Sequence, residues 1–248
     1  MKKPVKIALI VLCVIFLSIF VYSGYKLIST LHEYKVAEDT YNKISSDYVS
    51  PKSDKNKDKD NSDGNQITES SPVDVDFDAL LNQCQDVVGW LYSENTVINY
   101  PVVQAEDNEY YLNRSFKRKE ASCGTIFMDY QNNLNPLDRN TIVFGHNMGG
   151  SSSLMFSQLT KFKKQSYWEK HQTLQFDTPH RTGTWQILAV CHLDVGTLEQ
   201  FNFLQQDFIS DDAFVGFVQS IKARALYETN VYAPADGRLL TLVTCDRS

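Results

Sequence analysis

The sequence predicts a mainly β domain that is held at a membrane by an N-terminal helix. An uncharged apolar run lies near the N-terminus, many short runs of β-branched and aromatic residues follow, and helical periodicity is rare among them. Short strands with few intervening helices favour an antiparallel or mixed barrel over a parallel sheet of βαβ units. The length of 248 residues allows one large domain with additional segments.

The N-terminal end has the charge pattern of a membrane anchor. Residues 1–6 form a basic head, and the run from Ile7 to Tyr25 contains no charged residue. As a helix this run rises about 28 Å, close to the hydrocarbon thickness of a bilayer. We expect an uncleaved anchor, with a cleaved signal peptide as the alternative. The basic head places the N-terminus in the cytoplasm, so the chain crosses the cell membrane once and its folded domain is extracellular.

Two further segments precede the expected domain. Residues 26–50 predict a helical stalk that leaves the membrane. Residues 51–72 are polar, with Ile67 as their one aliphatic residue, and cannot bury enough surface to fold. We expect a flexible linker there and place the folded domain at residues 73–248.

The first part of the domain predicts one helix, three strands and a helical turn. Asp76 is the expected N-cap of a short helix near the start of the domain. Turn residues separate the first two strands, and Pro101 is expected to limit the second. The expected elements are a strand at 87–92, a strand at 96–100, a helical turn at 108–113, a strand at 124–129 and a loop at 132–136.

The second part of the domain contains the two strands that matter most for function. A strand at 141–146 ends on a histidine, and a closing strand at 239–244 is followed by a cysteine. Asp211 or Asp212 is expected to cap an amphipathic helix between them. The apolar face of this helix carries Phe214, Phe217, Val218, Ile221 and Ala225. Short helices are expected at 152–162 and 166–171, and strands at 173–176 and 184–193.

Charge and cysteine content exclude several function classes. The net charge of −6 leaves no basic footprint for binding nucleic acid. The five cysteines show neither a CxxC motif nor metal-ligand spacing with histidine, so no disulfide framework, metal or other cofactor is predicted. Cys84, Cys123 and Cys191 are expected to be small buried hydrophobes.

Cys245 and His146 form the candidate catalytic pair. Each stands where a strand-forming run gives way to a loop, and one sheet can bring the two strand ends together. The other histidines lie in the stalk, in a polar stretch or in a turn, apart from His192. That residue neighbours Cys191, but adjacent residues on a strand point to opposite faces. The alternative is a buried cysteine and a hydrogen-bonded histidine with no catalytic role.

The pair would support acyl transfer through a thioester. The thiolate is the nucleophilic form of cysteine, and a nearby imidazole or imidazolium favours it. His146 can take the proton of Cys245 and pass it to a leaving amine. Negative charge develops on the attacked carbonyl oxygen, so an arginine or backbone N–H groups must stabilise that oxygen.

Several motifs resemble those of one enzyme family. TLVTC, from Thr241 to Cys245, matches the TLxTC motif of sortases, the membrane-anchored cysteine transpeptidases of Gram-positive bacteria. FGHN, from Phe144 to Asn147, is similar to their catalytic-histidine segment. The sequences INYPVVQAEDNEYYLN and GTIFMDYQN resemble class B sortases in particular, as does a long helix at 211–227 before the cysteine strand. The anchor and linker also fit this family.

The resemblance implies an eight-stranded β-barrel with added helices and a specific reaction. Cys245 would be the nucleophile and His146 the acid and base. The enzyme would cleave an NPQTN-like sorting signal on surface proteins and transfer the acyl group to an amine, usually on a peptidoglycan precursor. By motif position, the residues expected to line the substrate groove are Asn108, Leu112, Phe144, Asp246 and, from the loop before the long helix, Thr197 and Phe201. Leu112 and Phe144 could equally be core residues, and Asn108 a helix cap.

One family feature has no counterpart in the sequence. Sortases carry an essential arginine on the strand after the cysteine strand, and this sequence ends three residues after Cys245. Arg247 is too close to the cysteine and Arg238 precedes its strand, so neither inherits the role. The expected last strand of the barrel is missing with it. Three interpretations follow: a fragment of a longer chain, a truncated gene with an inactive product, or Arg247 acting in an altered geometry.

Two alternative functions stay open. In a pilus-assembling sortase, a pilin lysine would replace the wall amine as acceptor. A non-catalytic sortase-like membrane protein would bind sorting peptides without turnover, which the missing arginine favours. The presence of both Cys245 and His146 favours an enzyme.

Overall fold

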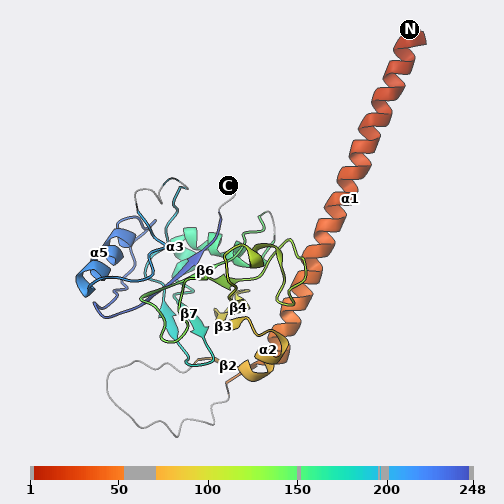
Figure 1. The fold of residues 1–248 in the computed structure, drawn as a ribbon. Coiled ribbons are helices and arrows are strands. Elements are labelled where there is room, and N and C mark those ends of the chain that lie inside the picture. The colour runs from red at the N-terminus through yellow and green to blue at the C-terminus, as the bar shows by residue number, and fades with distance from the viewer. Residues whose placement is uncertain (1–2, 53–70, 150–151, 195, 197–200, 246–248) are drawn as a thin grey trace.

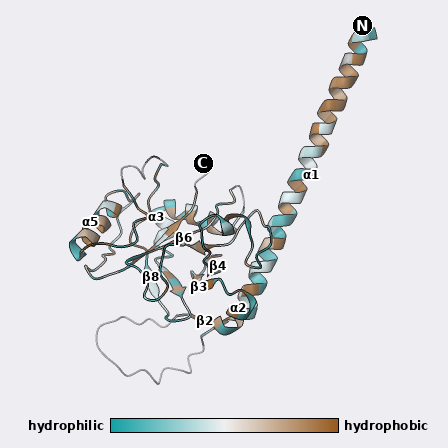
Figure 2. Cartoon of the chain, viewed as in Figure 1, coloured by the Kyte–Doolittle hydropathy of each residue, from teal (hydrophilic) through white to brown (hydrophobic). Residues whose placement is uncertain are grey.

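The computed structural model describes residues 3–52, 71–149, 152–194, 196 and 201–245. Its longest element is the helix α1 (Lys3–Tyr48), which contains the predicted anchor and all but the last two residues of the predicted stalk without a break. α1 is the one helix of the described ranges that is long and apolar enough to cross a membrane, and none of its most apolar window is buried in the domain. Figure 2 shows hydrophobic residues concentrated in the N-terminal half of this helix, which projects away from the domain.

Packing against the domain begins well before Val73. Tyr41 and Ile44 of α1 are 3% and 5% exposed, and both belong to the main core cluster. The strand β1 (Val49–Pro51) pairs antiparallel with β2 (Val73–Val75). The end of the predicted stalk is therefore part of the folded domain. Residues 52–72 join β1 to β2. The Lys52 N–H donates to the Pro72 carbonyl at 3.1 Å, which extends the pairing of the two strands.

The central structure is a mixed seven-stranded sheet that forms a nearly closed barrel (Figure 1). Its strand order is β8-β7-β3-β4-β5-β6-β9. The β4–β5 and β6–β9 pairs are parallel and the other pairs are antiparallel. The strands are β3 (Val87–Tyr92), β4 (Asn99–Val103), β5 (Phe127–Met128), β6 (Asn140–Phe144), β7 (Thr173–Asp177), β8 (Thr184–Gln186) and β9 (Leu239–Val243). The mainly β prediction is confirmed, with seven barrel strands in the described ranges where the resemblance implies eight.

Several strands differ from their predicted limits, and the strand predicted at 124–129 is regular only at Phe127–Met128. Pro101 was expected to limit its strand but lies inside β4, opposite Trp90. Proline is tolerated there because of how β4 meets its other neighbour, the short strand β5. β5 pairs with β4 only at Val103, so no hydrogen bond between these two strands requires the N–H that proline lacks. The strand predicted at 184–193 is regular only at Thr184–Gln186, because later residues pair with the chain after α5 through isolated contacts such as Cys191 with Ala225.

Short helices cover the sheet. They are α2 (Phe77–Gln83), the 3-10 helices η2 (Tyr110–Asn113) and η3 (Phe156–Lys163), α3 (Gln165–Trp168) and α5 (Asp211–Lys222). Asp76 caps α2 as predicted, accepting from the Ala79 N–H. α5 is capped by Ser210 and not by either aspartate, and it ends before Ala225. The two aspartates instead occupy its first turn, where negative charge interacts favourably with the helix dipole.

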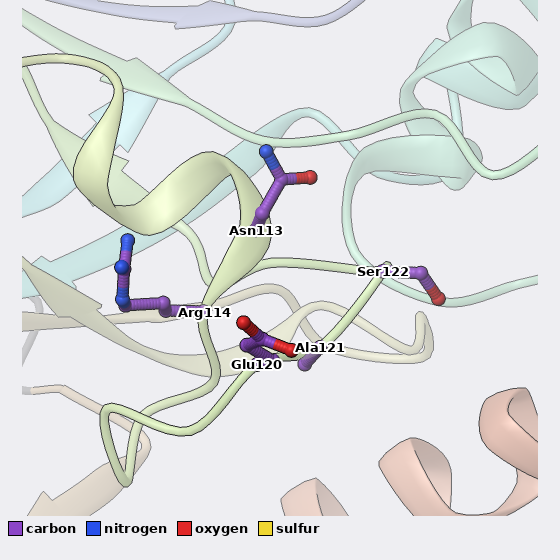
Figure 3. Close-up of a pocket in the computed structure, with 5 residues that line it drawn as sticks. All are labelled: Asn113, Arg114, Glu120, Ala121 and Ser122. Atoms are coloured by element: carbon purple, nitrogen blue, oxygen red, sulfur yellow. The ribbon is translucent and has the colours of Figure 1, made fainter.

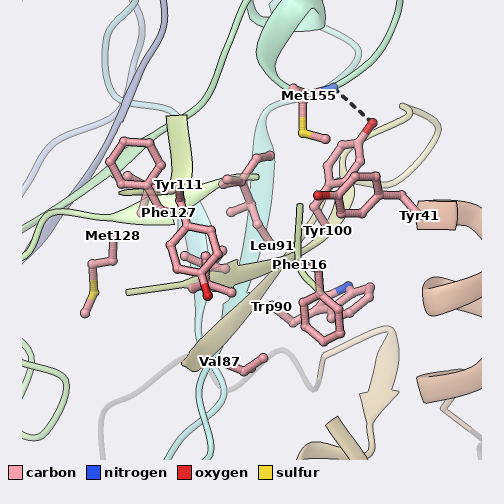
Figure 4. Close-up of a cluster of buried hydrophobic side chains, with 14 of the residues drawn as sticks. Tyr41, Val87, Trp90, Leu91, Tyr100, Tyr111, Phe116, Phe127, Met128 and Met155 are labelled. Atoms are coloured by element: carbon pink, nitrogen blue, oxygen red, sulfur yellow. Dashed lines mark hydrogen bonds between the residues drawn. The ribbon is translucent and has the colours of Figure 1, made fainter. Parts of the chain in front are cut away.

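The core lies inside the barrel and extends to α1. Figure 4 shows Tyr41 beside Tyr100, whose hydroxyl accepts a hydrogen bond from the Met155 N–H at 3.2 Å. The rings of Tyr41 and Tyr100 meet edge to face at 5.5 Å. Cys84 and Cys123 are buried as predicted, whereas Cys191 is half-buried. Burial raises the pKa of the Cys123 thiol, which disfavours its reactive thiolate.

Asp177 gives the fold a predictable dependence on pH. Burial raises the pKa of this 2% exposed carboxyl above its ordinary 3.8, although Gln175, Gly183 and Ser71 all donate hydrogen bonds to it. Between 3.8 and the raised pKa the folded state binds more protons than the unfolded state, so this group stabilises the fold less as pH rises.

We therefore expect the free energy of unfolding of the wild type, minus that of Asp177→Asn, to fall as pH rises through this window. The slope can reach at most about 1.4 kcal/mol per pH unit. Urea unfolding from about pH 3.5 to about pH 7, a range that spans the ordinary carboxyl pKa, measures this slope. Asp74→Asn, at an exposed position of β2, is the control. A difference that grows with pH would contradict the assignment.

Candidate active site

The sheet brings the two residues of the candidate pair to the same edge. β6 and β9 are adjacent and parallel, with Phe144 opposite Val243. The pairing continues beyond the strands, because the Gly145 N–H donates to the Val243 carbonyl at 3.1 Å and the Thr244 hydroxyl donates to the Gly145 carbonyl at 2.8 Å. His146 and Cys245 each lie two residues beyond these strands, so extending the register from Phe144 and Val243 sets them opposite each other, at about the 4.8 Å spacing of neighbouring strands.

His146 is oriented by a backbone carbonyl. Its Nε2 lies 2.7 Å from the carbonyl oxygen of Leu112. A carbonyl oxygen only accepts hydrogen bonds, so Nε2 carries the hydrogen and Nδ1 is the basic nitrogen of the neutral ring. The backbone beneath the ring is also held, since the His146 carbonyl accepts from the Phe156 N–H at 2.9 Å. Gly145 is needed here, because a Cβ would lie 2.7 Å from the Phe156 ring.

Cys245 is exposed at the end of β9. An exposed thiol at the end of a fixed strand is accessible to an external substrate, in contrast to the buried Cys84 and Cys123. Among the residues described, no cluster of three or more histidine, cysteine, aspartate or glutamate side chains could hold a metal ion.

The helix η2 presents the Leu112 carbonyl and is fixed from two sides. On one side the buried Tyr111 donates its hydroxyl hydrogen to Asp86, and Asp86 pairs with Arg118 at 2.6 Å. Burial, followed by the hydrogen bond to Asp86, raises the pKa of Tyr111, so its phenol remains a donor at neutral pH. On the other side Gly124, at φ +59°, is packed so closely that a Cβ would lie 2.6 Å from the Leu112 carbonyl oxygen.

The remaining predicted groove residues have diverse positions. The side-chain amide of Asn108 donates to Asp129 at 3.0 Å and its oxygen accepts from the Tyr130 N–H, so it ties η2 to β5. It is not a helix cap, because Asp107 accepts from the first N–H groups of this turn. Leu112 is half-buried beside the core cluster.

Phe144 and Phe201 pack against other aromatic or cationic side chains. Phe144 is half-buried, and its ring lies 5.4 Å from that of Phe127. Phe201 lies 5.3 Å from Phe217 of α5, with the guanidinium of Arg224 over its ring at 4.4 Å. The predicted residues Thr197 and Asp246, like Arg247, lie outside the described residues.

A shallow polar cavity borders η2 on the side of α1 (Figure 3). Its volume is about 370 Å³, and it is lined by Asn113, Arg114, Glu120, Ala121 and Ser122. The Arg114 side chain is held at the edge of the cavity by a hydrogen bond to the Tyr110 carbonyl at 3.2 Å.

The residue types in the sequence did not predict this cavity. They also did not predict that Leu112 would contact His146 through its backbone carbonyl. The glycine at position 124 was the one signal of a close backbone approach.

Comparison with known proteins identifies the family. No family model matches the sequence. Sortase B of Staphylococcus aureus is 31% identical over 242 residues, covering 98% of this chain and 88% of the relative. A substrate complex of S. aureus sortase B is 32% identical, with a TM-score of 0.64 over 69% of this chain and 77% of that one. Sortase B of Bacillus anthracis, in complex with AAEK1, is 28% identical, with a TM-score of 0.69 over 88% of this chain and 93% of that one. This chain, in which two neighbouring strand ends carry the thiol and the imidazole, thus belongs to the sortase B family.

Proposed function

We propose that this chain is a cysteine transpeptidase that cleaves a sorting signal through a thioester on Cys245. The observation that carries the proposal is the parallel register of β6 and β9, which sets an exposed thiol opposite an imidazole. Membership of the sortase B family supports the reaction class, and one relative was solved as a substrate complex. The substrate class is an NPQTN-like sorting signal on a surface protein.

The chemistry can be written from the atoms at this edge. Nδ1 of His146 takes the thiol proton, and the Cys245 sulfur attacks the carbonyl carbon of the scissile peptide bond. The C–N bond breaks as the imidazolium gives its proton to the leaving amine, which leaves a thioester. An acceptor amine then attacks the thioester, His146 takes a proton from that amine, and the C–S bond breaks to return the thiol.

We further propose the cellular arrangement. α1 anchors the chain in the cell membrane with its N-terminus in the cytoplasm and the catalytic domain outside, and the acceptor is an amine of a peptidoglycan precursor. The uncharged run of α1 supports a membrane span, and the basic head supports the orientation. A pilin lysine is the alternative acceptor.

Trapping the acyl-enzyme tests the mechanism. The full-length protein is mixed with an NPQTN-like peptide, and tryptic peptides are searched by mass spectrometry for the acyl adduct. We expect the adduct on the peptide containing Cys245, and its loss when a peptidoglycan-type amine is added. Cys123→Ala, which removes a buried thiol, should retain the adduct. An adduct that persists in Cys245→Ala would overturn the assignment of the nucleophile, and transfer only to a pilin lysine would replace the acceptor.

A further inference from the structure

Four consecutive backbone carbonyls at the end of η2 have two kinds of partner. Three of them accept hydrogen bonds from the segment 121–125, which lies beside η2 in Figure 3. The pairs are the Ala121 N–H with Asn113 at 3.0 Å, the Thr125 N–H with Tyr111 at 3.1 Å and the Thr125 hydroxyl with Arg114 at 2.8 Å. The fourth carbonyl is that of Leu112, which contacts His146. The segment 121–125 therefore fixes the backbone on both sides of the carbonyl that binds the histidine.

Thr125 is the centre of this arrangement. It is 2% exposed, and both its N–H and its hydroxyl donate to the backbone around Leu112. Because the hydroxyl gives its hydrogen to the Arg114 carbonyl, its oxygen accepts from the Tyr41 hydroxyl, which lies 3.0 Å away. Tyr41 shares the same phenol hydrogen with the Gly124 carbonyl at 3.1 Å. A side chain of α1 is thus linked to the carbonyl of Leu112 through one intervening residue.

The two hydroxyls add direction to a corner that is already filled. Tyr41 is 3% exposed, and a phenylalanine there would bury almost the same apolar surface. A valine in place of Thr125 would likewise keep the branched shape. Apolar burial is non-directional, whereas a hydrogen bond weakens steeply when its distance or angle departs from the optimum. A carbonyl that meets an imidazole nitrogen at 2.7 Å depends on that directional control.

We propose that Thr125 and Tyr41 are positioning residues for His146, the proposed acid and base. They hold the Leu112 carbonyl where it accepts from Nε2 of the ring, which leaves Nδ1 as the basic nitrogen. The proposal rests on the proposed transpeptidase function and deepens it, because two buried residues act on the acid and base through the backbone. It also makes the docked part of α1 a component of the site, since Tyr41 lies on the helix that carries the apolar run.

A second contact between α1 and the domain supplies a control for general loosening of the helix. The Asn99 side chain on β4 donates to the Ser45 hydroxyl, one turn after Tyr41 on the same helix. This hydrogen bond involves no residue of 111–114 or 121–125. Ser45→Ala therefore weakens the docking of α1 without removing a bond from the backbone around Leu112.

The experiment compares four variants of the full-length protein in detergent micelles. Thr125→Val and Tyr41→Phe each remove one hydroxyl, Thr125→Ser restores a hydroxyl at the same position, and Ser45→Ala is the control. Nitrogen NMR shifts of the His146 ring, recorded without substrate, report which ring nitrogen carries the hydrogen. Cleavage of a quenched NPQTN-like peptide gives kcat and KM, and thermal unfolding shows that each variant is folded.

The wild type should show a ring protonated on Nε2, whereas Thr125→Val should show mixed tautomers. We expect kcat of Thr125→Val to fall by about tenfold or more, because even a small displacement of the Leu112 carbonyl misaligns the ring. KM should stay within about twofold, since no contact with the substrate is removed. Tyr41→Phe should change the same signals in the same direction but less, because Thr125 keeps its bond to Arg114. Thr125→Ser and Ser45→Ala should behave like the wild type.

Wild-type ring signals and kcat in Thr125→Val would overturn the proposal. So would equal losses in Ser45→Ala, because the effect would then come from loosening of α1 alone. If Thr125→Val does not fold, the ring signals of Tyr41→Phe decide, and unchanged signals there overturn the proposal as well. A wild type that is folded but cleaves no sorting peptide would instead overturn the proposed function, while the ring signals would still test the positioning of His146.

Discussion

Replacing His146 with asparagine is expected to slow acylation of the enzyme by a sorting peptide by about 10²–10⁴-fold, the usual contribution of a general acid and base. Asparagine retains an N–H that can donate to the Leu112 carbonyl, so the backbone contact at 2.7 Å in the wild type can persist. What asparagine lacks is the basic nitrogen that, in the proposed mechanism, would take the thiol proton and return it to the leaving amine.

The effect should appear in kcat, measured by cleavage of a quenched peptide, with little change in KM. The iodoacetamide reactivity of Cys245 should fall in parallel, because thiolate formation depends on the same ring. His171→Asn is the matched control. A ring nitrogen of His171 also binds a backbone carbonyl, the carbonyl of Tyr167, but His171 lies next to α3 and not beside Cys245. Equal activity of the His146→Asn variant and the wild type would remove His146 from the mechanism.

Replacing Gly124 with alanine is expected to lower both stability and turnover. A side chain in the left-handed region costs about 1–2 kcal/mol. In addition, the new Cβ would lie 2.6 Å from the carbonyl oxygens of both Tyr111 and Leu112, so η2 must shift. The Leu112 carbonyl orients His146, and a displacement of about 1 Å at such a group can reduce the rate about 10²-fold.

Gly149→Ala separates the two causes. Gly149 has a similar φ of +68°, but no atom lies within 4 Å of its added Cβ, so this variant reproduces the strain without the displacement. Thermal unfolding should detect a loss of stability in both variants, whereas kcat should fall strongly only for Gly124→Ala. Nitrogen NMR shifts of the His146 ring should show mixed tautomers in that variant alone. Equal losses of kcat would mean that Gly124 acts only through strain.

The strands that lead to the candidate pair could be predicted because β-branched, aliphatic and aromatic side chains favour strands wherever they occur in a run. TIVF and TLVT are strand-forming runs, and both became paired strands, β6 and β9. The role of Leu112 could not be predicted, because the group that binds His146 is a carbonyl that every residue has. The cap of α5 was wrong for a related reason. Ser210 and the aspartates after it are all good caps, and backbone geometry decides between them.

The docking of α1 could have been predicted. The residues of its end that pack against the core are spaced alternately by three and four positions, which is the spacing of one helix face. They are Tyr34, Ala37, Tyr41, Ile44 and Tyr48. This pattern predicts a partner for the segment that was expected to be a free stalk. The pairing of β1 with β2 is harder to predict, because both strands are three residues long and a polar segment separates them.

The pairing of β1 with β2 also has a consequence for how this chain can vary and be engineered. Because the Lys52 N–H donates to the Pro72 carbonyl, the two ends of the intervening segment are held together. Doubling the length of such a loop costs only about 0.6 kcal/mol in closure entropy. We therefore expect that an affinity tag or a reporter domain inserted between positions 53 and 70 leaves the paired ends of β6 and β9 unchanged, which makes these positions the natural entry point for labelling the protein in living cells.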